Sequence, residues 1–313
     1  MRLLERAALD GHSAVPLETV LAAVARPVVE GAVDRGAVLV ADGWVALDEI
    51  ALVEDALADE ILGLAAEDRL ALVLGSVPEG AEVVEVGDAH RRSLEDLAEA
   101  LQAVPEDVRV VISGDPDALP GPHPGAVLAD LLAWGRLPVR DLRPDGAAGG
   151  TALAALPASL RAGSLPAPAD RSVVVVPCAD DEAVVRRAVQ LVTDSVPRVF
   201  GVAAQDVLVV TPLRRGAAGV RALVEALPAG TRVSTVHDAA RGGPLPAADA
   251  VVACFPGQAT GVLSRALVYS AAMLAGRHLS VVTAAGDALP QAVVQGAGRP
   301  RWTRLPGLLA SSE

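Results

Sequence analysis

The second half of the chain alternates between short apolar runs and amphipathic segments. Runs of Val, Leu and Ala without polar alternation are typical of strands that are buried on both faces of a sheet. They predict five strands, at Ser172–Val176, Asp206–Thr211, Arg232–Val236, Ala250–Cys254 and Leu279–Thr283. Helical spacing predicts the segments between them, at Asp181–Ser195, Ala217–Leu227 and Leu263–Leu274. This order of elements predicts a parallel, doubly wound α/β sheet.

Residues 70–134 follow a similar but shorter α/β alternation. The pattern predicts strands at Leu70–Leu74, Glu82–Val86 and Arg109–Ser113 and helices at Leu94–Val104 and Ala126–Trp134. Only the seven residues Gly75–Ala81 join the first two strands. A right-handed helical crossover between parallel strands takes at least about 10–12 residues. We therefore expect this sheet to be truncated.

The first 68 residues predict a small helical region with a hairpin. Val15–Val24 and Arg26–Arg35 have helical spacing, and Val38–Leu47 predicts a hairpin that turns at Asp42–Gly43. Asp48 is expected to cap a helix that runs to about Ala65.

One apolar stripe follows this helix and is a candidate interface. Its members are Ile50, Val53, Leu57, Ile61 and Leu64. A truncated sheet leaves apolar surface or an unpaired strand edge that something must cover. The stripe covers that surface from within the chain, or it docks a partner protein or a second copy; both alternatives stay open.

The chain of 313 residues is long enough for about two domains. A stretch rich in Gly, Ala and Pro, residues 144–170, predicts a linker with a short helix at Ala152–Arg161. We expect a helical and winged region at 1–68, a truncated first domain at 69–143 and a second domain at 171–313.

Composition narrows the class of protein. Hydrophobic residues make up 52% of the chain, which is enough for a buried core. Neither a membrane span nor a signal peptide is expected, since the first residues carry Glu5 and Asp10 and have no apolar run. Cys178 and Cys254 are too few for a disulfide framework or a four-cysteine zinc site. We expect a cytoplasmic protein without metal or cofactor.

All 26 basic residues are arginines, because the sequence contains no lysine. A P-loop NTPase normally places a lysine on the nucleotide phosphates, and a Schiff-base enzyme needs an amine. A protein kinase needs its strand lysine. None of these mechanisms is available here in its usual form.

Charge is distributed unevenly around the net value of −13. Residues 1–120 hold 25 acidic residues and 8 arginines, whereas residues 121–313 hold 14 and 18. We therefore expect weak or no binding of nucleic acid, confined to the C-terminal part. The candidate contacts there are Arg214 and Arg215 at a strand end, His237 at the next strand end, and Trp302 as a stacking residue.

Several segments, taken in order, resemble RecD-type superfamily-one helicases, the family of the exonuclease V alpha subunit. Gly114–Pro120 (GDPDALP) with Pro124–Leu131 (PGAVLADL) resembles the family's G-D-x-D-Q-L-P and G-x-V-L-x-D-L. Val209–Gly219 resembles V-x-T-P-M-R-R-G-x-x-G, and Thr235–His237 resembles the start of T-V-H-K-S-Q-G-S-E. Leu263–Leu279 resembles the segment that carries Y-T-A-x-T-R-A. The resemblance implies two RecA-like lobes, the first truncated.

The departures from the family pattern fall on its catalytic positions. The P-loop is missing, the acidic pair is reduced to Gly87–Asp88, and the glutamine of the G-D-x-D-Q-L-P segment is Ala118. The arginine-finger position is Leu274. Asp88, Asp115 and Leu274 therefore mark remnants of a nucleotide site, and every named part of phosphoryl transfer is affected.

These observations favour a catalytically inactive RecD-like homologue. We expect a structural or regulatory subunit with a protein partner, in DNA repair, recombination or plasmid maintenance. One alternative is an ATP-dependent helicase subunit that a partner completes. Another is a nucleotide-responsive binding module that uses Asp88, Asp115, Arg214 and Arg215 without turnover.

Overall fold

Two compact units make up the chain. The computed structural model describes residues 1–78, 82–144, 150–167, 169–241, 247–296 and 300–311. Unit 1 contains residues 1–116, 120–143 and 299–313, and unit 2 contains residues 117–119 and 144–298. Four consecutive segments were expected, whereas here both ends of the chain belong to unit 1.

Unit 1 begins with a helix-turn-helix and a hairpin wing. The order is α1 (Arg2–Leu9), β1 (Ala14–Pro16), α2 (Leu17–Ala23), α3 (Arg26–Val33), β2 (Val38–Ala41) and β3 (Trp44–Leu47). The strands form an antiparallel sheet in the order β1-β3-β2. Asp42 and Gly43 both have positive φ (51° and 80°), which confirms the predicted tight hairpin turn.

The expected helix at Val15–Val24 starts later than its spacing suggested. Val15 and Pro16 pair with β3 as a strand, and Leu17 opens the helix after Pro16, whose φ of −52° and ψ of 133° are extended. Long-range pairing with the hairpin therefore overrides the local helical pattern.

The long helix α4 (Asp48–Ala66) joins this region to the first parallel sheet. Its N-cap is Leu47, so Asp48 lies in the first turn and does not cap the helix as expected. A carboxylate is favourable there because it faces the positive end of the helix dipole.

The first parallel sheet has the order β5-β6-β4-β7. Its strands are β4 (Leu70–Leu74), β5 (Val84–Val86), β6 (Val110–Gly114) and β7 (Val139–Asp141), with α5 (Leu94–Gln102) and α6 (Val127–Trp134) between them. The strand β7 was not expected: it is a short edge strand with three exposed residues and no apolar pattern. The described part of the connection from β4 to β5 contains no helix, in line with the expected truncation.

The apolar stripe of α4 is covered inside unit 1. Leu57 and Ile61 are fully buried, and they share a core with Leu72, Ile112 and Leu97 from the sheet and α5. Leu64 is buried in the same core, and Ile50 and Val53 pack at its margin.

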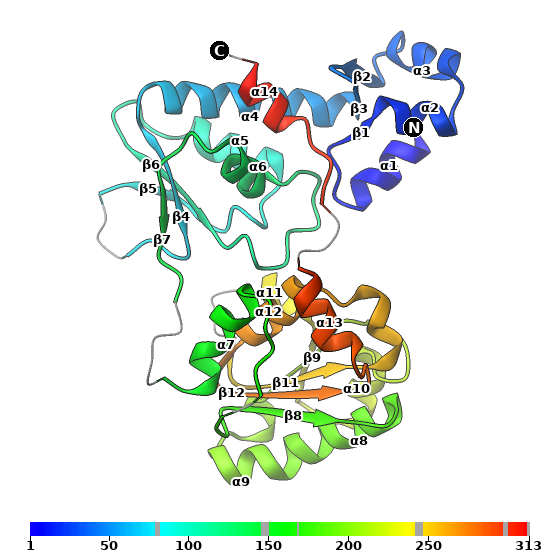
Figure 1. Ribbon diagram of the computed structural model, residues 1–313, viewed down its shortest axis with the longest axis vertical. Helices are drawn as coiled ribbons and strands as arrows, with labels where there is room; N and C mark the ends of the chain where they lie inside the picture. Colours follow the sequence, from blue (N-terminus) through cyan, green and yellow to red (C-terminus); the bar gives the residue numbers. More distant parts are fainter. Residues whose placement is uncertain (79–81, 145–149, 168, 242–246, 297–299, 312–313) are drawn as a thin grey trace. The chain divides into compact units, whose positions relative to one another are not determined.

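The C-terminal residues also complete unit 1 (Figure 1). Residues 301–311, which we call the C-terminal strap, end in α14 (Leu305–Ala310), which packs against α4 and α6. Leu305 and Leu309 are buried in the same core as the stripe. The second domain therefore does not extend to residue 313, because these apolar side chains are buried in unit 1.

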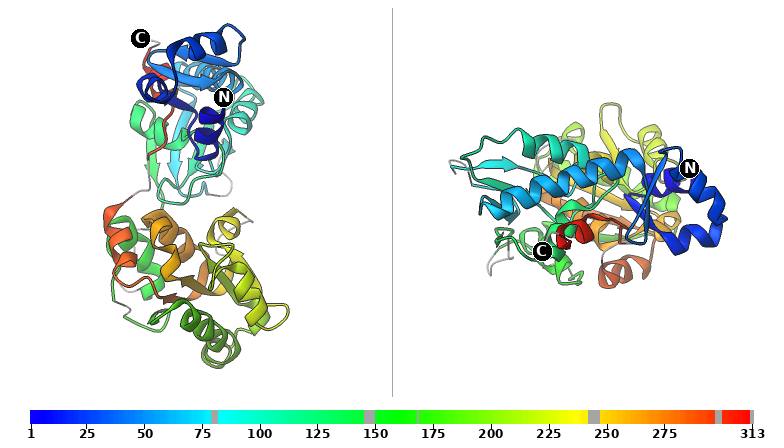
Figure 2. Two further views of the ribbon diagram at one scale, coloured as in Figure 1. Left: turned by 90° about the vertical axis from the view of Figure 1, so that its right-hand side faces the viewer. Right: turned by 90° about the horizontal axis from the view of Figure 1, so that it is seen from above.

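Unit 2 is a five-stranded parallel sheet in the order β10-β9-β11-β12-β8. The strands are β8 (Val173–Pro177), β9 (Leu208–Thr211), β10 (Arg232–Thr235), β11 (Ala248–Phe255) and β12 (Ala275–Thr283). One apolar core packs the sheet against α7 (Ala152–Arg161), α12 (Arg265–Met273) and α13 (Ala288–Gln295). A second core packs it against α8 (Asp181–Gln190) and α10 (Val220–Ala226) (Figure 2). The predicted α/β class, with two parallel sheets of which the first is smaller, is confirmed.

Two segments of unit 2 differ from expectation. The helix expected at Asp181–Ser195 ends as α8 at Gln190 and continues through a wider π-helical turn, Leu191–Ser195, into α9 (Val196–Phe200). Pro197 lies at this junction; a proline lacks the N–H that would bond within the helix, and the wider turn accommodates it.

His237, expected at a strand end, lies in the first turn of a short helix, α11 (Val236–Arg241).

Candidate functional site

Ligands of parallel α/β sheets bind beyond the carboxyl ends of the strands. Each unit has one such edge, and the polar residues singled out in the sequence lie at both. We describe the two edges separately.

The carboxyl edge of unit 1 is occupied by the chain itself. Arg143, just after β7, pairs with Asp115, just after β6, at 3.1 Å between Nη1 and Oδ1. Both side chains are largely buried, and Arg143 also pairs with Asp141 at 2.7 Å. Gly75, which follows β4, has a φ of +103°, and a Cβ there would meet the backbone of Leu142 and Arg143 at 3.3 Å. The end of β4 is thus closed by the segment that follows β7.

Asp88 and His90 follow β5 at the same edge. Asp88 has a φ of +57°, and its carbonyl oxygen accepts a hydrogen bond from the Arg91 N–H in a tight turn. His90 lies against Asp115, whose backbone N–H is 3.2 Å from Nδ1. Burial lowers the pKa of His90 to about 4, so this imidazole is neutral at pH 7. Asp88 and Asp115 are therefore at one edge, as the strand order predicts.

The remaining remnant positions belong to unit 2. Ala118 packs against its core, and the Leu119 N–H donates to Ser270 Oγ on α12 at 2.8 Å. Leu274 is fully buried in the same core. Leu274 therefore packs in the core, and its side chain has no exposed surface with which to contact a bound nucleotide.

The carboxyl edge of unit 2 carries an open cleft of about 300 Å³. Its walls come from the loop after β9, the start of α10, the strand β10 and the start of α11. The lining residues are Arg214, Val220, Arg221, Val233, Ser234, Thr235 and Asp238. Arg214 was predicted as an anion contact and lines this cleft, whereas Arg215 and His237 lie nearby but outside its lining.

A hydrogen-bond network orders the arginine side of this cleft. Arg214 Nη2 donates to both carboxylate oxygens of Asp238, at 3.0 and 2.8 Å. Asp238 also accepts from Thr235 Oγ1 at 2.8 Å, and its own N–H donates to that hydroxyl. Desolvation and then the charge of Arg241 lower the pKa of His237, which favours its neutral form. The cleft thus offers cationic and hydroxyl groups held by a fixed carboxylate.

Trp302 lies in unit 1, in the C-terminal strap, and not with these arginines. Its indole stacks on His12 with 4.6 Å between ring centroids, and the backbone N–H of Trp302 donates to His12 Nδ1 at 2.8 Å. Arg301 beside it donates to the carbonyl oxygens of Gly121, His123 and Gly125. Trp302 is therefore a packing residue of unit 1.

Two buried carboxyl groups under the strap were not expected. Glu54 Oε1 accepts from Ser13 Oγ and from the backbone N–H groups of Arg304 and Leu305, at 2.8 to 3.1 Å. Asp130 Oδ1 accepts from Thr303 Oγ1 at 3.0 Å. The second oxygen of each carboxyl group is buried and has no hydrogen-bond partner. The sequence contains one signal for this cluster, because Glu54 lies on the otherwise apolar face of α4.

Burial dominates the electrostatics of this pair. It raises the pKa of Asp130 to about 7, with the charge of Glu54 adding to the effect. Burial also raises the pKa of Glu54, against the hydrogen bonds that favour its charged form. A neutral Asp130 is therefore well populated near pH 7.

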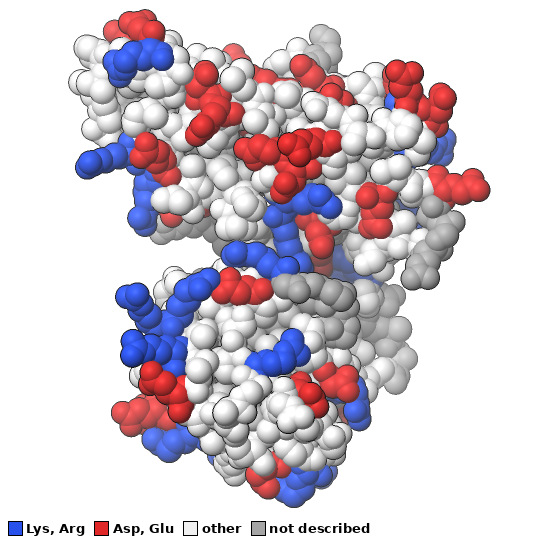
Figure 3. All heavy atoms as spheres, turned by 180° about the vertical axis from the view of Figure 1, so that it is seen from behind, with Lys and Arg blue, Asp and Glu red and all other residues white. Residues whose placement is uncertain are grey.

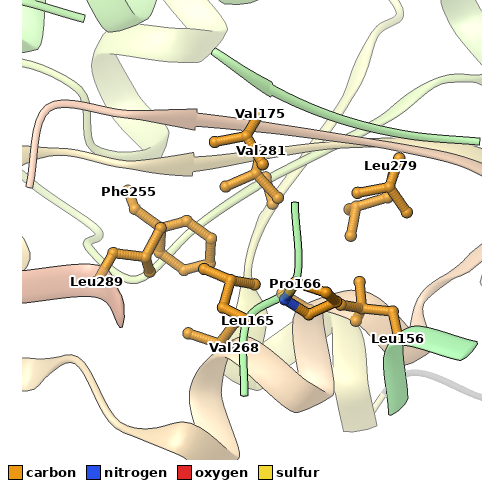
Figure 4. A pocket seen from close by; sticks show the side chains of 13 residues that line it. Leu156, Leu165, Pro166, Val175, Phe255, Val268, Leu279, Val281 and Leu289 are labelled. Carbon is orange, nitrogen blue, oxygen red and sulfur yellow. The ribbon is translucent and has the colours of Figure 1, made fainter. Parts of the chain in front are cut away.

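Other candidate chemistry is limited among the described residues. They contain no group of three or more His, Cys, Asp or Glu residues that could hold a metal ion. Cys178 and Cys254 are free thiols, and burial raises the pKa of Cys254 to about 12. Leu165 and Pro166 line a small apolar cavity with a volume of about 10 Å³ (Figure 4). No described helix is both long and apolar enough to cross a membrane.

The chain has a distant structural similarity to a helicase of known structure. No protein-family model matches the chain, and no curated protein matches its sequence. Among solved structures, the chain is similar to the arterivirus nonstructural protein 10 helicase, with a TM-score of 0.38 at 15% identity over 81% of this chain and 71% of that one. The complex of that helicase with DNA gives 0.37 and 15% over 82% and 70%. A similarity at this level carries no argument about activity.

Proposed function

We propose that the chain is a catalytically inactive RecD-like helicase homologue that acts as a structural or regulatory subunit and binds other proteins. DNA repair, recombination or plasmid maintenance is the setting that the sequence motifs favour. The observation that carries the proposal is the carboxyl edge of unit 1. Where a motor of this type would hold nucleotide phosphates, the chain places the Arg143–Asp115 pair.

Phosphoryl transfer needs a phosphate cradle, a cation on the phosphates, a metal-holding acid and a water-positioning group. The chain has no lysine, and the described part of the connection after β4 has no helix whose N-terminus could bind phosphate. Asp115 is engaged with Arg143, and Leu274 is buried. Restoring one of these parts would leave the others missing.

The retained features are those of a scaffold. Unit 2 keeps a complete parallel sheet with a core on each face. Unit 1 carries 27 acidic residues and 14 arginines, which disfavours nucleic acid as its partner. Figure 3 shows acidic side chains spread over the visible face of unit 1. A protein partner fits these properties better than a nucleotide or a DNA strand.

Calorimetry with Mg-ATP tests the catalytic part of this proposal on the full chain. We expect no binding tighter than millimolar and no ATPase activity above background. The variant Arg143→Ala releases Asp115 from its pair and should still show no activity, because the phosphate cradle is missing. A micromolar dissociation constant that is lost in Asp115→Asn would contradict the proposal and favour a helicase subunit that a partner completes.

A further inference from the structure

The strand β10 is one of the two outer strands of the sheet of unit 2, and β8 is the other. It pairs with β9 along one edge, from Arg232↔Leu208 to Thr235↔Thr211. Within the described residues, no strand pairs with its other edge, and no turn or loop hydrogen bond involves the backbone of residues 232–235. An unpaired strand edge presents N–H and C=O groups that can accept a further strand.

The cleft described above runs along this edge. Its lining includes three consecutive residues of β10, namely Val233, Ser234 and Thr235. Successive side chains of a strand point to opposite faces of the sheet. A lining that contains three consecutive residues indicates that the cleft reaches the edge of this strand.

The lining of the cleft carries two arginines and one aspartate, and Arg221 is also paired with Glu225 at 3.1 Å. Arg214, fixed by Asp238, and Arg221, at the start of α10, are both in its lining, and Val220 and Val233 supply apolar surface. Strand addition uses main-chain hydrogen bonds for affinity and side-chain contacts for specificity. The described residues of the lining include no aromatic side chain for the base stacking that supports binding of single-stranded nucleic acid.

We propose that the cleft along β10 binds an extended acidic segment of a partner protein, which adds a strand to the sheet of unit 2. Glutamate or aspartate side chains of this segment would face Arg214 and Arg221, and apolar side chains would contact Val220 and Val233. This inference rests on the proposed function, since it names the surface through which the scaffold holds a partner. The nucleotide experiment concerns unit 1, so each proposal can fail without the other.

The test uses the full chain and a labelled ten-residue peptide of alternating glutamate and valine. Fluorescence anisotropy should show saturable binding that weakens with added salt, because exposed charges are screened. Hydrogen exchange should show that the backbone N–H groups of β10 that face away from β9, which belong to alternate residues of the strand, become protected when the peptide binds. Absence of binding or of this protection overturns the proposal.

Matched variants separate the cleft from general attraction to arginines. Arg221→Glu should weaken peptide binding at least about tenfold, which corresponds to about 1.4 kcal/mol. Arg186→Glu is the control: this exposed arginine on α8 has a glutamate one helical turn away, as Arg221 does, but lies outside the cleft. Equal weakening by both variants would contradict the assignment.

A third comparison tests the strand pairing itself. A peptide with alternate N-methylated residues keeps the charges but loses main-chain donors, and it should bind much more weakly. Equal affinity of the two peptides would contradict strand addition. Displacement of the acidic peptide by a thymidine oligonucleotide at equal concentration would assign the cleft to nucleic acid and overturn the proposal.

Discussion

The two units differ in how the faces of their parallel sheets are covered. Both are built on a parallel sheet, and such sheets are normally covered on both faces. Unit 2 has five strands, with an apolar core on each face. The parallel sheet of unit 1 has four short strands, and its core forms on the face that carries Leu70, Leu72 and Ile112. Val73 and Val111, on the other face, belong to no apolar core among the described residues.

The difference shows what replaces a missing crossover helix. Unit 2 is stabilised by helices that lie between its own strands (α8, α10 and α12) or directly before and after them (α7 and α13). Unit 1 is stabilised by α5 and α6 between its strands and by α4 directly before them, and also by the C-terminal strap, which comes from the other end of the chain. Unit 1 therefore depends on contacts of very long sequence separation, and perturbing them should affect it first.

The largest effect is expected from charges placed in the stripe of α4. The double variant Leu57→Asp and Ile61→Asp buries two unpaired carboxylates in the core of unit 1 and should cost several kcal/mol. Hydrogen exchange should show unit 1 unfolded and the sheet of unit 2 still protected. Leu52→Asp on the same helix is the control, because Leu52 is 62% exposed. A double variant that stays folded and only loses a partner would identify the stripe as a docking surface.

The next effect concerns Asp130 beneath the strap. Its pKa is raised from 3.8 to about 7 in the folded state, so the folded protein binds the proton more tightly than the unfolded chain. The free energy of unfolding should therefore fall as pH rises from about 4 to about 7, and this contribution is constant above pH 7. A shift of about three pKa units corresponds to at most about 4 kcal/mol.

Comparison with Asp130→Asn isolates this contribution. Asparagine keeps the acceptor for Thr303 but cannot ionise, so the variant should be more stable than the wild type above pH 7 and similar to it near pH 4. His90, with its pKa lowered to about 4, opposes the trend between pH 4 and 6.5, but it is common to both proteins. Asp59→Asn, an exposed change on α4, is the control for an aspartate-to-asparagine substitution in unit 1. Chemical denaturation at several pH values gives the difference, and parallel curves for wild type and Asp130→Asn would refute the prediction.

Local pattern was enough to predict every strand of the two parallel sheets except β7. The strand Leu70–Leu74 and the helix Ala152–Arg161 have the predicted bounds, because their apolar spacing agrees with their final packing. The helix α14 was not predicted, since its six residues include Pro306 and Gly307 and its helix is fixed by burial against α4 and α6. Tertiary contacts decide whether such short segments become helical, and a single sequence does not show these contacts.

The candidate sites show the same limit. Strand order placed Asp88 and Asp115 at one edge, and Arg214 at another. The partners that decide their chemistry, Arg143 and Asp238, come from elements whose positions depend on the folded chain. Trp302 was grouped with the arginines because it is close to arginines in the sequence, but the strap carries it into unit 1.

The smallest effect on stability is expected from a change to the exposed pair of Arg214 and Asp238 in unit 2. Arg214→Ala removes the pair with Asp238, yet the arginine side chain is 76% exposed, and exposed ion pairs contribute about 0–1 kcal/mol. Thermal unfolding should therefore change little, in contrast to the buried changes in unit 1. A double-mutant cycle with Asp238→Ala should give a coupling energy below about 1 kcal/mol, which decreases further with salt. A coupling of several kcal/mol would mean that this pair supports the fold of unit 2 as the buried apolar stripe supports unit 1, and the contrast between the two units would fail.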